Sequence, residues 1–319
     1  MPILTSNYQS KGLFKNGHLS TLYSAKLRLQ KVPDYTRERI HLPDSDFLDI
    51  DWCHSGPNTT DLIIMLHGLE GNAKRTYMVG GTNHALALGW DVAAVNFRGC
   101  SGEPNLKYYS YNAGKTDDLE VVVQHIAAQN KYKRIALVGY SLGGNMILKY
   151  LGDSSPGAAH IYKGVAVSSP LSLKDSLARL EEPQNWIYRT SFLWSMKRKL
   201  VKKQREFPDH ILPKTIKSIS SILDFDNTYT APAHGFKDAF QYYQHSSSLH
   251  YLPNIKVPVL ILNAKNDSFL SGKCYPTTLA NESKHIYLEM PIHGGHVGFV
   301  AANNLYYNEH KTLAFLNDH

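Results

Sequence analysis

Long apolar runs are absent from this 319-residue sequence. No stretch reaches the ~20 consecutive apolar residues that a membrane-spanning helix requires, so the sequence predicts no transmembrane segment. The amino-terminal residues also lack the basic head, the apolar middle and the small-residue cleavage site of a secretory signal peptide. We therefore expect a soluble protein that meets membranes only at their surface, by peripheral contact.

Cysteine is scarce as well. The three cysteines, Cys53, Cys100 and Cys274, are odd in number and widely spaced, so they do not suggest a disulfide framework. No C-x-x-C pair suggests a metal site. This cysteine usage is typical of a reducing compartment, and we expect a cytoplasmic protein without a bound metal.

The charge balance is moderately positive. Lys and Arg number 34 against 27 Asp and Glu, which gives a formal net charge of +7. Such a charge favours non-specific attraction to anionic surfaces. No recognised nucleic-acid-binding module accompanies the charge, so we predict no nucleic-acid partner. Hydrophobic residues make up 43% of the chain, which is enough for a sizeable core without disulfides or metals.

Apolar runs and amphipathic stretches alternate from residue 61 onward. The spacing predicts strands at Leu62–Leu66, Trp90–Phe97, Ile135–Val138, Gly164–Ser168, Val257–Asn263 and His285–Met290, and helices over 74–88, 116–129, Leu142–Leu151 and 303–317. This alternation is typical of an α/β fold with a mostly parallel central sheet and helices on both faces. Two partly alternating runs within residues 36–54 flank the turn cluster Pro43–Asp46, and this pattern predicts a hairpin.

The strand–helix rhythm stops over residues 171–250, which contain aromatic and basic residues but little strand pattern. We interpret this segment as a mostly helical cap inserted over the carboxyl edge of the sheet. The core domain then consists of residues 36–170 and 251–319. Residues 1–35 form an amino-terminal extension that packs on this core and contains a short helix.

One motif indicates nucleophilic catalysis. Residues Gly139–Gly143 read G-x-S-x-G, preceded by the apolar run Arg134–Val138 and followed by the start of a helix. In this strand–turn–helix context the central Ser141 occupies a sharp, strained turn, and the flanking glycines let the strand and helix approach closely. The helix amino terminus favours developing negative charge. We predict that Ser141 is a nucleophile.

A serine nucleophile needs a base, and His296 is the candidate. It follows the last predicted strand in H-G-G-H-V-G-F, where two glycines let the loop bend back. His293, three residues earlier, is its main rival. We favour His296 because Gly294 and Gly295 precede it and an apolar segment follows it.

The orienting acid should lie between the nucleophile and the base in the chain. Asp267 follows the strand Val257–Asn263, and a carboxylate at the carboxyl end of a strand points to the face where active sites form. Its rivals lie in the cap rather than at a strand end: Asp224, Asp226 and Asp238. We therefore predict Asp267 as the acid.

Two backbone N–H groups should form the oxyanion hole. One belongs to Leu142, the residue after the nucleophile, and the other to the loop after an early strand. His67–Gly71 follows Leu62–Leu66 directly, so Leu69 is the predicted second donor. We expect His67 to brace this loop by hydrogen bonds and to take no proton.

Six segments in this order resemble the α/β-hydrolase superfamily and, within it, the YheT-type branch related to plant EMB8 proteins and the mammalian ABHD1/ABHD3 group. They are F-K-N-G-H-L-S-T-L (Phe14–Leu22), H-G-L-E-G (His67–Gly71), N-F-R-G-C-S-G (Asn96–Gly102), G-Y-S-L-G-G-N (Gly139–Asn145), N-A-K-N-D-S-F (Asn263–Phe269) and G-G-H-V-G-F (Gly294–Phe299). Together they are specific to this branch. The resemblance covers nearly the whole chain and implies the α/β-hydrolase fold.

The resemblance also implies a function. It implies hydrolysis of carboxylic esters, with acylglycerols, phospholipids or short-chain esters as the small-molecule or lipid substrate, and no cofactor. An amidase, peptidase or thioesterase on the same triad is the alternative, and a non-catalytic ligand-binding protein is a remote one. Eukaryotic members of the branch often carry an amino-terminal membrane anchor, from which this chain departs.

Three further features leave alternatives open. Arg98 either forms an ion pair within its loop, which we favour, or contacts an anionic group of the substrate. The cap aromatics either line an acyl pocket or seal the cap onto the core: Trp186, Tyr188, Phe192 and Trp194. The basic cluster over residues 197–205 either is a solvated helix face, which we favour, or contacts an anionic membrane.

Overall fold

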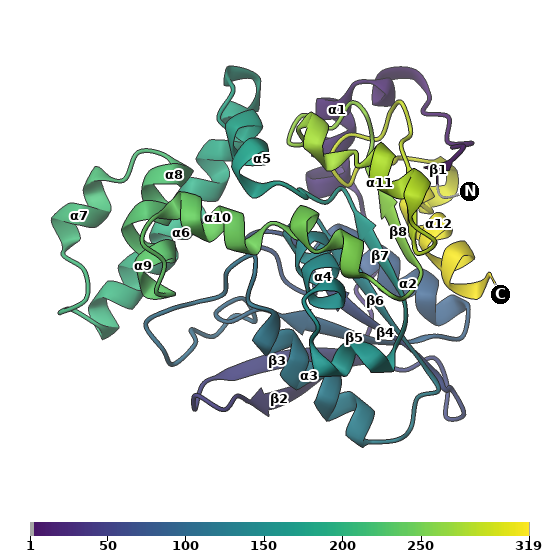
Figure 1. Ribbon diagram of the computed structural model, residues 1–319, viewed down its shortest axis with the longest axis horizontal. Helices are drawn as coiled ribbons and strands as arrows, with labels where there is room; N and C mark the ends of the chain where they lie inside the picture. Colours follow the sequence, from purple (N-terminus) through teal and green to yellow (C-terminus); the bar gives the residue numbers. More distant parts are fainter. Residues whose placement is uncertain (1–2, 319) are drawn as a thin grey trace.

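A nine-stranded sheet forms the centre of the protein, whose computed structural model describes residues 3–318 (Figure 1). The strands lie in the order β1-β9-β8-β7-β6-β4-β5-β3-β2, and among the described residues only β2–β3 and β3–β5 pair antiparallel. Their bounds are β1 (Ile3–Leu4), β2 (Thr36–His41), β3 (Phe47–Cys53), β4 (Asp61–Leu66), β5 (Asp91–Asn96), β6 (Arg134–Tyr140), β7 (Ile161–Val167), β8 (Val259–Leu262) and β9 (Ile286–Glu289).

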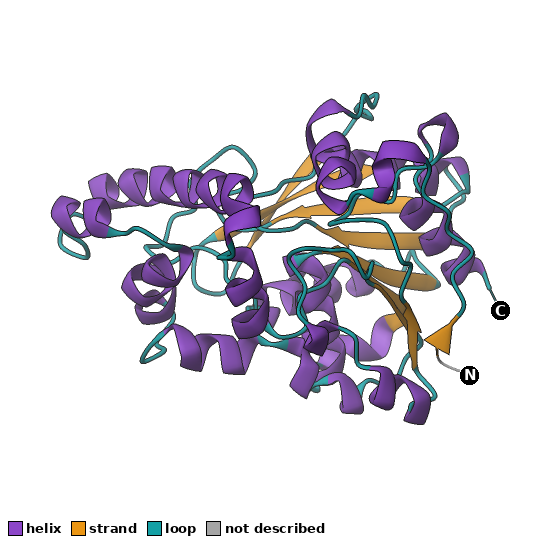
Figure 2. Cartoon of the chain, turned by 90° about the horizontal axis from the view of Figure 1, so that it is seen from above, coloured by secondary structure: helices purple, strands orange, loops and turns teal. Residues whose placement is uncertain are grey.

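Helices cover both faces of the sheet, as Figure 2 shows. They are α1 (Gly17–Leu22), α2 (Thr76–Ala87), α3 (Thr116–Ala128), α4 (Leu142–Gly152), α5 (Leu173–Leu180), α6 (Trp186–Glu206), α7 (Pro213–Ser218), α8 (Ile222–Phe225), α9 (Ala231–Ala233), α10 (Ala239–Ser246), α11 (Thr277–Glu282) and α12 (Tyr307–Asn317). The α/β fold with a mostly parallel sheet is therefore confirmed, including each predicted core strand and helix.

The central strand β4 shows why the apolar runs become strands. Successive side chains of a strand point to opposite faces. Leu62 and Ile64 pack into the core cluster that also contains residues of α3 and α4. Ile63 and Met65 pack into the second cluster, together with residues of α2 and α12. A strand buried on both faces must be apolar at every position, which is the pattern of a central parallel strand.

The amino-terminal segment differs from the expectation of irregular chain with one short helix. The helix is present as α1, but Ile3–Leu4 also adds strand β1 to the sheet edge, parallel to β9. Two residues are too few to show a strand periodicity in the sequence. The same segment is tied to α12 by Arg28, whose guanidinium and the Glu309 carboxylate form a fully buried ion pair.

Helices α5 to α10 lie together on one side of the molecule, between β7 and β8 in the chain and away from both termini (Figure 1). They have a core of their own, which includes Leu180, Met196, Leu200 and Phe225 and also Phe269 from the loop after β8. We call these helices the cap helices. Where the core ends and the cap begins stays a prediction.

Arg98 forms ion pairs, but its partners lie outside its own loop. Its Nη2 lies 2.7 Å from Asp118 Oδ1 of α3, and its Nη1 lies 2.7 Å from Asp44 Oδ2 and 2.9 Å from Asp46 Oδ2 in the β2–β3 turn. Burial alone would raise the pKa of Asp44, but hydrogen bonds from Tyr109 and Arg98 lower that pKa to about 2. The arginine therefore joins a hairpin, a loop and a helix.

We expect Arg98→Met to destabilise the fold by about 3–5 kcal/mol, because it leaves buried carboxylates without their cation. Urea unfolding monitored by circular dichroism measures this change. Arg179→Met is the matched control, since its ion pair with Glu182 is 41% and 32% exposed and should contribute less than about 1 kcal/mol. Equal losses in the two variants would contradict the prediction.

Candidate active site

Ser141 occupies the turn between β6 and α4 in a strained conformation. Its φ of 54° and ψ of −119° lie where side chains are rarely tolerated. A Cβ on Gly139 would lie 2.3 Å from the Gly143 carbonyl oxygen, and one on Gly143 would lie 2.5 Å from the Leu66 carbonyl oxygen. Both positions therefore require glycine. Because α4 is buried along its whole length, the turn is held between two rigid elements.

The residues predicted as nucleophile and acid, Ser141 and Asp267, each lie within hydrogen-bond distance of the predicted base His296. Nε2 of His296 lies 2.9 Å from Ser141 Oγ, and Nδ1 of His296 lies 2.8 Å from Asp267 Oδ2. Asp267 is 3% exposed, and its second oxygen accepts the backbone N–H of Phe269 at 2.9 Å. This geometry suits a neutral imidazole that donates to the carboxylate and accepts from the serine hydroxyl.

The rival residues lie elsewhere. The buried Nδ1 atom of His293 has no hydrogen-bond partner among the described residues. Asp224 and Asp238 accept backbone N–H groups at the starts of α8 and α10. Asp226 instead accepts the Tyr243 hydroxyl at 2.6 Å. Asp224 and Asp238 thus serve at helix starts and Asp226 binds a tyrosine inside the cap, so each of the three carboxylates that competed with Asp267 has another role.

Residues from distant parts of the chain hold His296, and sequence analysis missed them. The backbone N–H of His296 donates to Thr21 Oγ1 at 2.8 Å, and that of Val297 donates to Ser168 Oγ at 2.9 Å. The Phe269 ring packs on the imidazole with ring centroids 4.2 Å apart. Thr21 lies in the Phe14–Leu22 motif, which the sequence analysis singled out without assigning it a role.

The loop His67–Gly71 runs beside the nucleophile. A Cβ on Gly68 would lie 3.1 Å from Ser141 Cβ, so the loop passes directly over the serine. The amides of Gly68 and Glu70 donate to tyrosine hydroxyls, at 3.0 and 2.8 Å. Within residues 3–318, the amide of Leu69 between them and that of Leu142 have no hydrogen-bond acceptor. These two N–H groups are thus available to an oxyanion.

His67 braces this loop. Its Nδ1 lies 2.7 Å from the Gly68 carbonyl oxygen, and its Nε2 accepts the backbone N–H of Phe97 at 3.2 Å. Burial lowers the pKa of His67 to about 3, so the ring is neutral at physiological pH. The arrangement agrees with the expected structural role.

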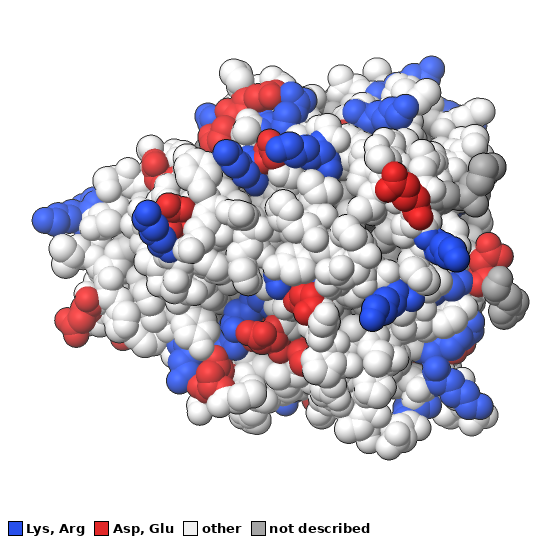
Figure 3. Space-filling model, viewed as in Figure 1, with Lys and Arg blue, Asp and Glu red and all other residues white. Residues whose placement is uncertain are grey.

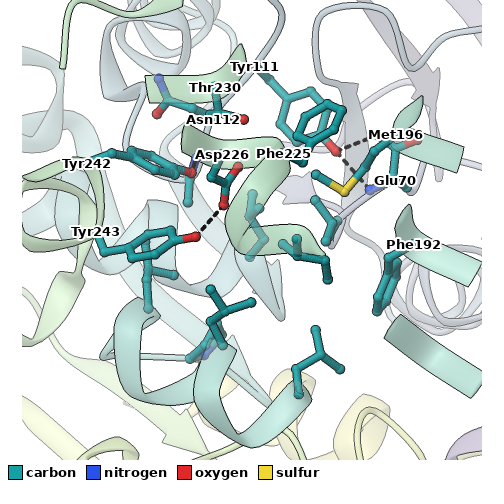
Figure 4. A pocket seen from close by; sticks show the side chains of 18 of the residues that line it. Glu70, Tyr111, Asn112, Phe192, Met196, Phe225, Asp226, Thr230, Tyr242 and Tyr243 are labelled. Carbon is teal, nitrogen blue, oxygen red and sulfur yellow. Dashed lines mark hydrogen bonds between the residues drawn. The ribbon is translucent and has the colours of Figure 1, made fainter. Parts of the chain in front are cut away.

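A large apolar cavity opens beside Ser141 and His296. Figure 4 shows part of its lining, with Phe192, Met196 and Phe225 among the labelled residues. Its volume is about 1150 Å³ when the space open to solvent is included. Its walls come mainly from the cap helices, with residues such as Leu173, Leu177, Leu180, Phe192, Met196 and Leu200. The cavity is therefore an apolar chamber with the serine at its wall, suited to a hydrocarbon group.

The four aromatic residues of α6 have three different environments: the cavity wall, the contact between cap and core, and solvent. Phe192 lines the cavity, while Tyr188 packs on Phe269 with ring centroids 4.8 Å apart and so seals the cap onto the core. Trp186 and Trp194 do neither, since they are 58% and 62% exposed. One helix presents several faces, so neighbouring aromatics on α6 have different environments.

The described residues contain neither a membrane-spanning helix nor a cluster of metal-binding side chains. Between residues 3 and 318, no helix is both long and apolar enough to cross a membrane. In the same part of the chain, no three His, Cys, Asp or Glu side chains are grouped as metal ligands would be.

Comparison with known proteins places this geometry in context. The profile of the family described as the alpha/beta hydrolase fold matches residues 61–301. Escherichia coli YheT, provisionally named as an esterase, is 33% identical over 92% of this chain and 87% of its own. Mouse phospholipase ABHD3 is 27% identical over 94% of this chain and 74% of its own. The resemblance to the YheT-type branch is thus confirmed.

Solved structures show the same architecture. An esterase of Pyrococcus furiosus aligns with a TM-score of 0.60 and 20% identity, covering 89% of this chain and 90% of that chain. At this identity the likeness supports the fold alone.

The buried carboxyl of Asp226 makes the stability of the folded protein depend on pH. It is 7% exposed, and burial raises its pKa from 3.8 to about 6. The folded protein therefore binds this proton more tightly than the unfolded chain, and it loses stability as pH rises from about 4 to about 6. At about 1.4 kcal/mol per pKa unit, the cost at neutral pH is about 3 kcal/mol.

We expect Asp226→Asn, which keeps an acceptor for the Tyr243 hydroxyl, to stabilise the protein by up to about 3 kcal/mol at pH 7.5. The gain should shrink to about 1 kcal/mol at pH 4.5 and approach zero only below about pH 4, where the carboxyl is protonated in the unfolded chain as well. Urea unfolding at both pH values, with Asp209→Asn on the surface as control, measures it. A loss of stability that is the same at both pH values would contradict the raised pKa.

Proposed function

Because this chain belongs to the α/β-hydrolase fold family, we propose that it hydrolyses carboxylic esters with Ser141 as nucleophile, His296 as base and Asp267 as orienting acid. The observation that carries the proposal is the hydrogen-bonded chain Asp267–His296–Ser141, at 2.8 and 2.9 Å, on a strained turn. Such strain persists where the surrounding structure enforces it, and it is concentrated at functional sites.

Acylation begins when Ser141 Oγ attacks the acyl carbonyl carbon of the ester. His296 Nε2 takes the hydroxyl proton, and Asp267 stabilises the resulting imidazolium and holds the ring orientation. The imidazolium then gives that proton to the departing alkoxide as the C–O bond breaks. An acyl-serine ester remains on the enzyme, and the alcohol diffuses away.

Negative charge develops on the carbonyl oxygen during this step. The N–H groups of Leu69 and Leu142 donate to it, each contributing about 2.7–4 kcal/mol to the stability of the transition state. Ser141 at the amino terminus of α4 also lies at the positive end of the helix dipole. Water, deprotonated by His296, attacks the acyl carbon; as the bond to Ser141 Oγ breaks, the imidazolium returns that proton to Oγ and the acid is released.

The cavity indicates the substrate class. Its walls are apolar and adjoin the serine, so the acyl or alkyl part of the ester fits there. Similar proteins are named as an esterase and a phospholipase. The proposed substrates are therefore short- to medium-chain acyl esters, including acylglycerols and phospholipids.

We expect Ser141→Ala to fold normally, to lose covalent labelling by a fluorophosphonate probe and to lose p-nitrophenyl ester turnover by about 10⁴-fold or more. Intact mass and peptide mapping locate the label in the wild type. Ser218→Ala, an exposed serine of the cap, is the matched control and should label as the wild type does. Turnover retained in Ser141→Ala would refute the assignment of the nucleophile.

The outer face of α6 is the proposed site of peripheral membrane contact. On the face of the molecule shown in Figure 3, basic and acidic side chains are interspersed. By contrast, residues 186–205 contain seven basic and no acidic residues, of which Lys199 and Lys203 point inward to the core and the other five remain for the outer side. Trp186 and Trp194 are exposed on this helix, and the Arg198 guanidinium lies 4.6 Å from the Trp194 ring centroid. Exposed tryptophan beside basic residues suits the headgroup region of an anionic bilayer.

We expect the protein to float with vesicles that contain anionic phosphatidylserine and to stay behind with neutral phosphatidylcholine vesicles. Trp186→Ser with Trp194→Ser, and separately Arg198→Gln with Arg205→Gln, should weaken binding, the latter by about tenfold or more at ~1 kcal/mol per charge. Leu88→Ser removes an exposed apolar side chain far from the cap and is the control. Absence of flotation at low salt would exclude the contact.

A further inference from the structure

Glu70 adopts an unusual conformation next to the proposed oxyanion donor. It follows Leu69 directly, its φ is 54°, and it is 8% exposed. A residue with a side chain is strained in the left-handed region and stays there only when its surroundings determine its position. Positions with this φ usually hold glycine, but here the residue is a glutamate whose carboxylate is nearly buried. Specific contacts must therefore hold Glu70 in place.

The carboxylate of Glu70 binds the cap. Ser195 Oγ donates to its Oε2 at 2.6 Å, and Lys199 Nζ donates to its Oε1 at 3.0 Å. Both donors lie on α6 and are four residues apart, so they project from one face of that helix. The Lys199 and Glu70 side chains are 32% and 6% exposed, so solvent screens this ion pair only partly.

The rest of Glu70 is bound to the core. Its backbone N–H donates to the Tyr111 hydroxyl at 2.8 Å, and that hydroxyl donates to Glu70 Oε1 at 3.0 Å. Arg75 Nη2 donates to its carbonyl oxygen at 2.7 Å. Figure 4 shows Glu70 and Tyr111 joined by dashed lines beside Met196 of α6. One residue thus links the loop after β4, the core and the cap helix that lines the cavity.

We propose that Glu70 is a positioning residue that fixes the Leu69 N–H toward the oxyanion through its bonds to Ser195 and Lys199 on the cap helix α6. The inference rests on the proposed function. The Leu69 N–H shares a peptide unit with the Gly68 carbonyl, which lies 2.7 Å from His67 Nδ1 and accepts the Gly71 N–H at 3.0 Å. Glu70 holds the peptide unit on the other side of Leu69, so Leu69 is fixed from both ends. The cap then takes part in catalysis: it shapes the cavity and also completes the oxyanion hole.

The bonds to the cap can be removed without altering the oxyanion loop itself. In the double variant Ser195→Ala with Lys199→Met, we expect kcat for a soluble p-nitrophenyl ester to fall about tenfold or more, because a small misplacement of a catalytic group is costly. KM should change less than about threefold, since the interaction acts in the transition state. Inhibition by a trifluoromethyl ketone, which forms an oxyanion on Ser141, should weaken by the same factor as kcat.

Two further variants separate positioning from stability. Glu70→Gln keeps an acceptor for the Ser195 hydroxyl but loses the charge that pairs with Lys199, so its kcat should lie between those of the double variant and the wild type. Ser191→Ala with Lys214→Met removes the same residue types from exposed positions of the cap and should match the wild type. Circular dichroism and thermal unfolding establish that each variant is folded.

The outcomes discriminate between the proposals. Fluorophosphonate labelling of wild-type Ser141 together with a selective loss of kcat and of ketone affinity in the double variant supports the positioning role. If the wild type labels but the double variant stays within twofold of the control in kcat and ketone affinity, the role of Glu70 is overturned and the proposed function stands. If folded wild-type protein neither labels nor hydrolyses esters, both are overturned.

Discussion

The close approach of backbone around Ser141 is the constraint on which the rest of the site depends. Strand β6, helix α4 and the loop after β4 come so near to one another that side chains at positions 139 and 143 would overlap main-chain atoms. This crowding holds the serine in its strained conformation. The strain is tolerated because β6 is a central strand and α4 is buried along its length. The Ser141 hydroxyl is therefore presented by two elements that are buried in the core.

The partners of Ser141 come from loops, and loops need support. The loop that carries His296 contains several residues with positive φ, among them Gly295 and Val297. It is held by hydroxyl groups of Thr21 and Ser168, each of which accepts a backbone N–H. Because Thr21 belongs to α1, the amino-terminal segment acts as a structural support for His296, the proposed base. The ion pair between Arg28 and Glu309 fastens this segment to α12 at the far side.

Helix α6 combines functions that a shorter helix could not. Its inward side contributes Phe192 and Met196 to the cavity, and Ser195 and Lys199 bind Glu70. Its outer side exposes Trp186 and Trp194. The cavity wall, the contacts to Glu70 and the exposed tryptophans thus all belong to one helix. The cap and the core are thus joined by polar contacts at the loop that runs beside Ser141 as well as by apolar packing.

Much of this architecture was determined by local sequence patterns. Continuous apolar runs predicted the buried strands, and helical periodicity predicted the helices. Ser141, Asp267 and His296 were selected by their order in the chain and by their places just after predicted strands. These signals are local, because a strand buried on both faces must be apolar whatever covers it. The six family motifs added the fold and the reaction class.

Tertiary structure alone decided which distant residues support the site. Thr21 and His296 are 275 positions apart, and Ser195 and Glu70 are 125 apart. The division of the α6 aromatics between cavity, seal and solvent was likewise undetermined, as were the partners of Arg98 and the pairing of β1. Such contacts depend on how whole elements pack against one another, and a pattern within a single element contains no record of that placement.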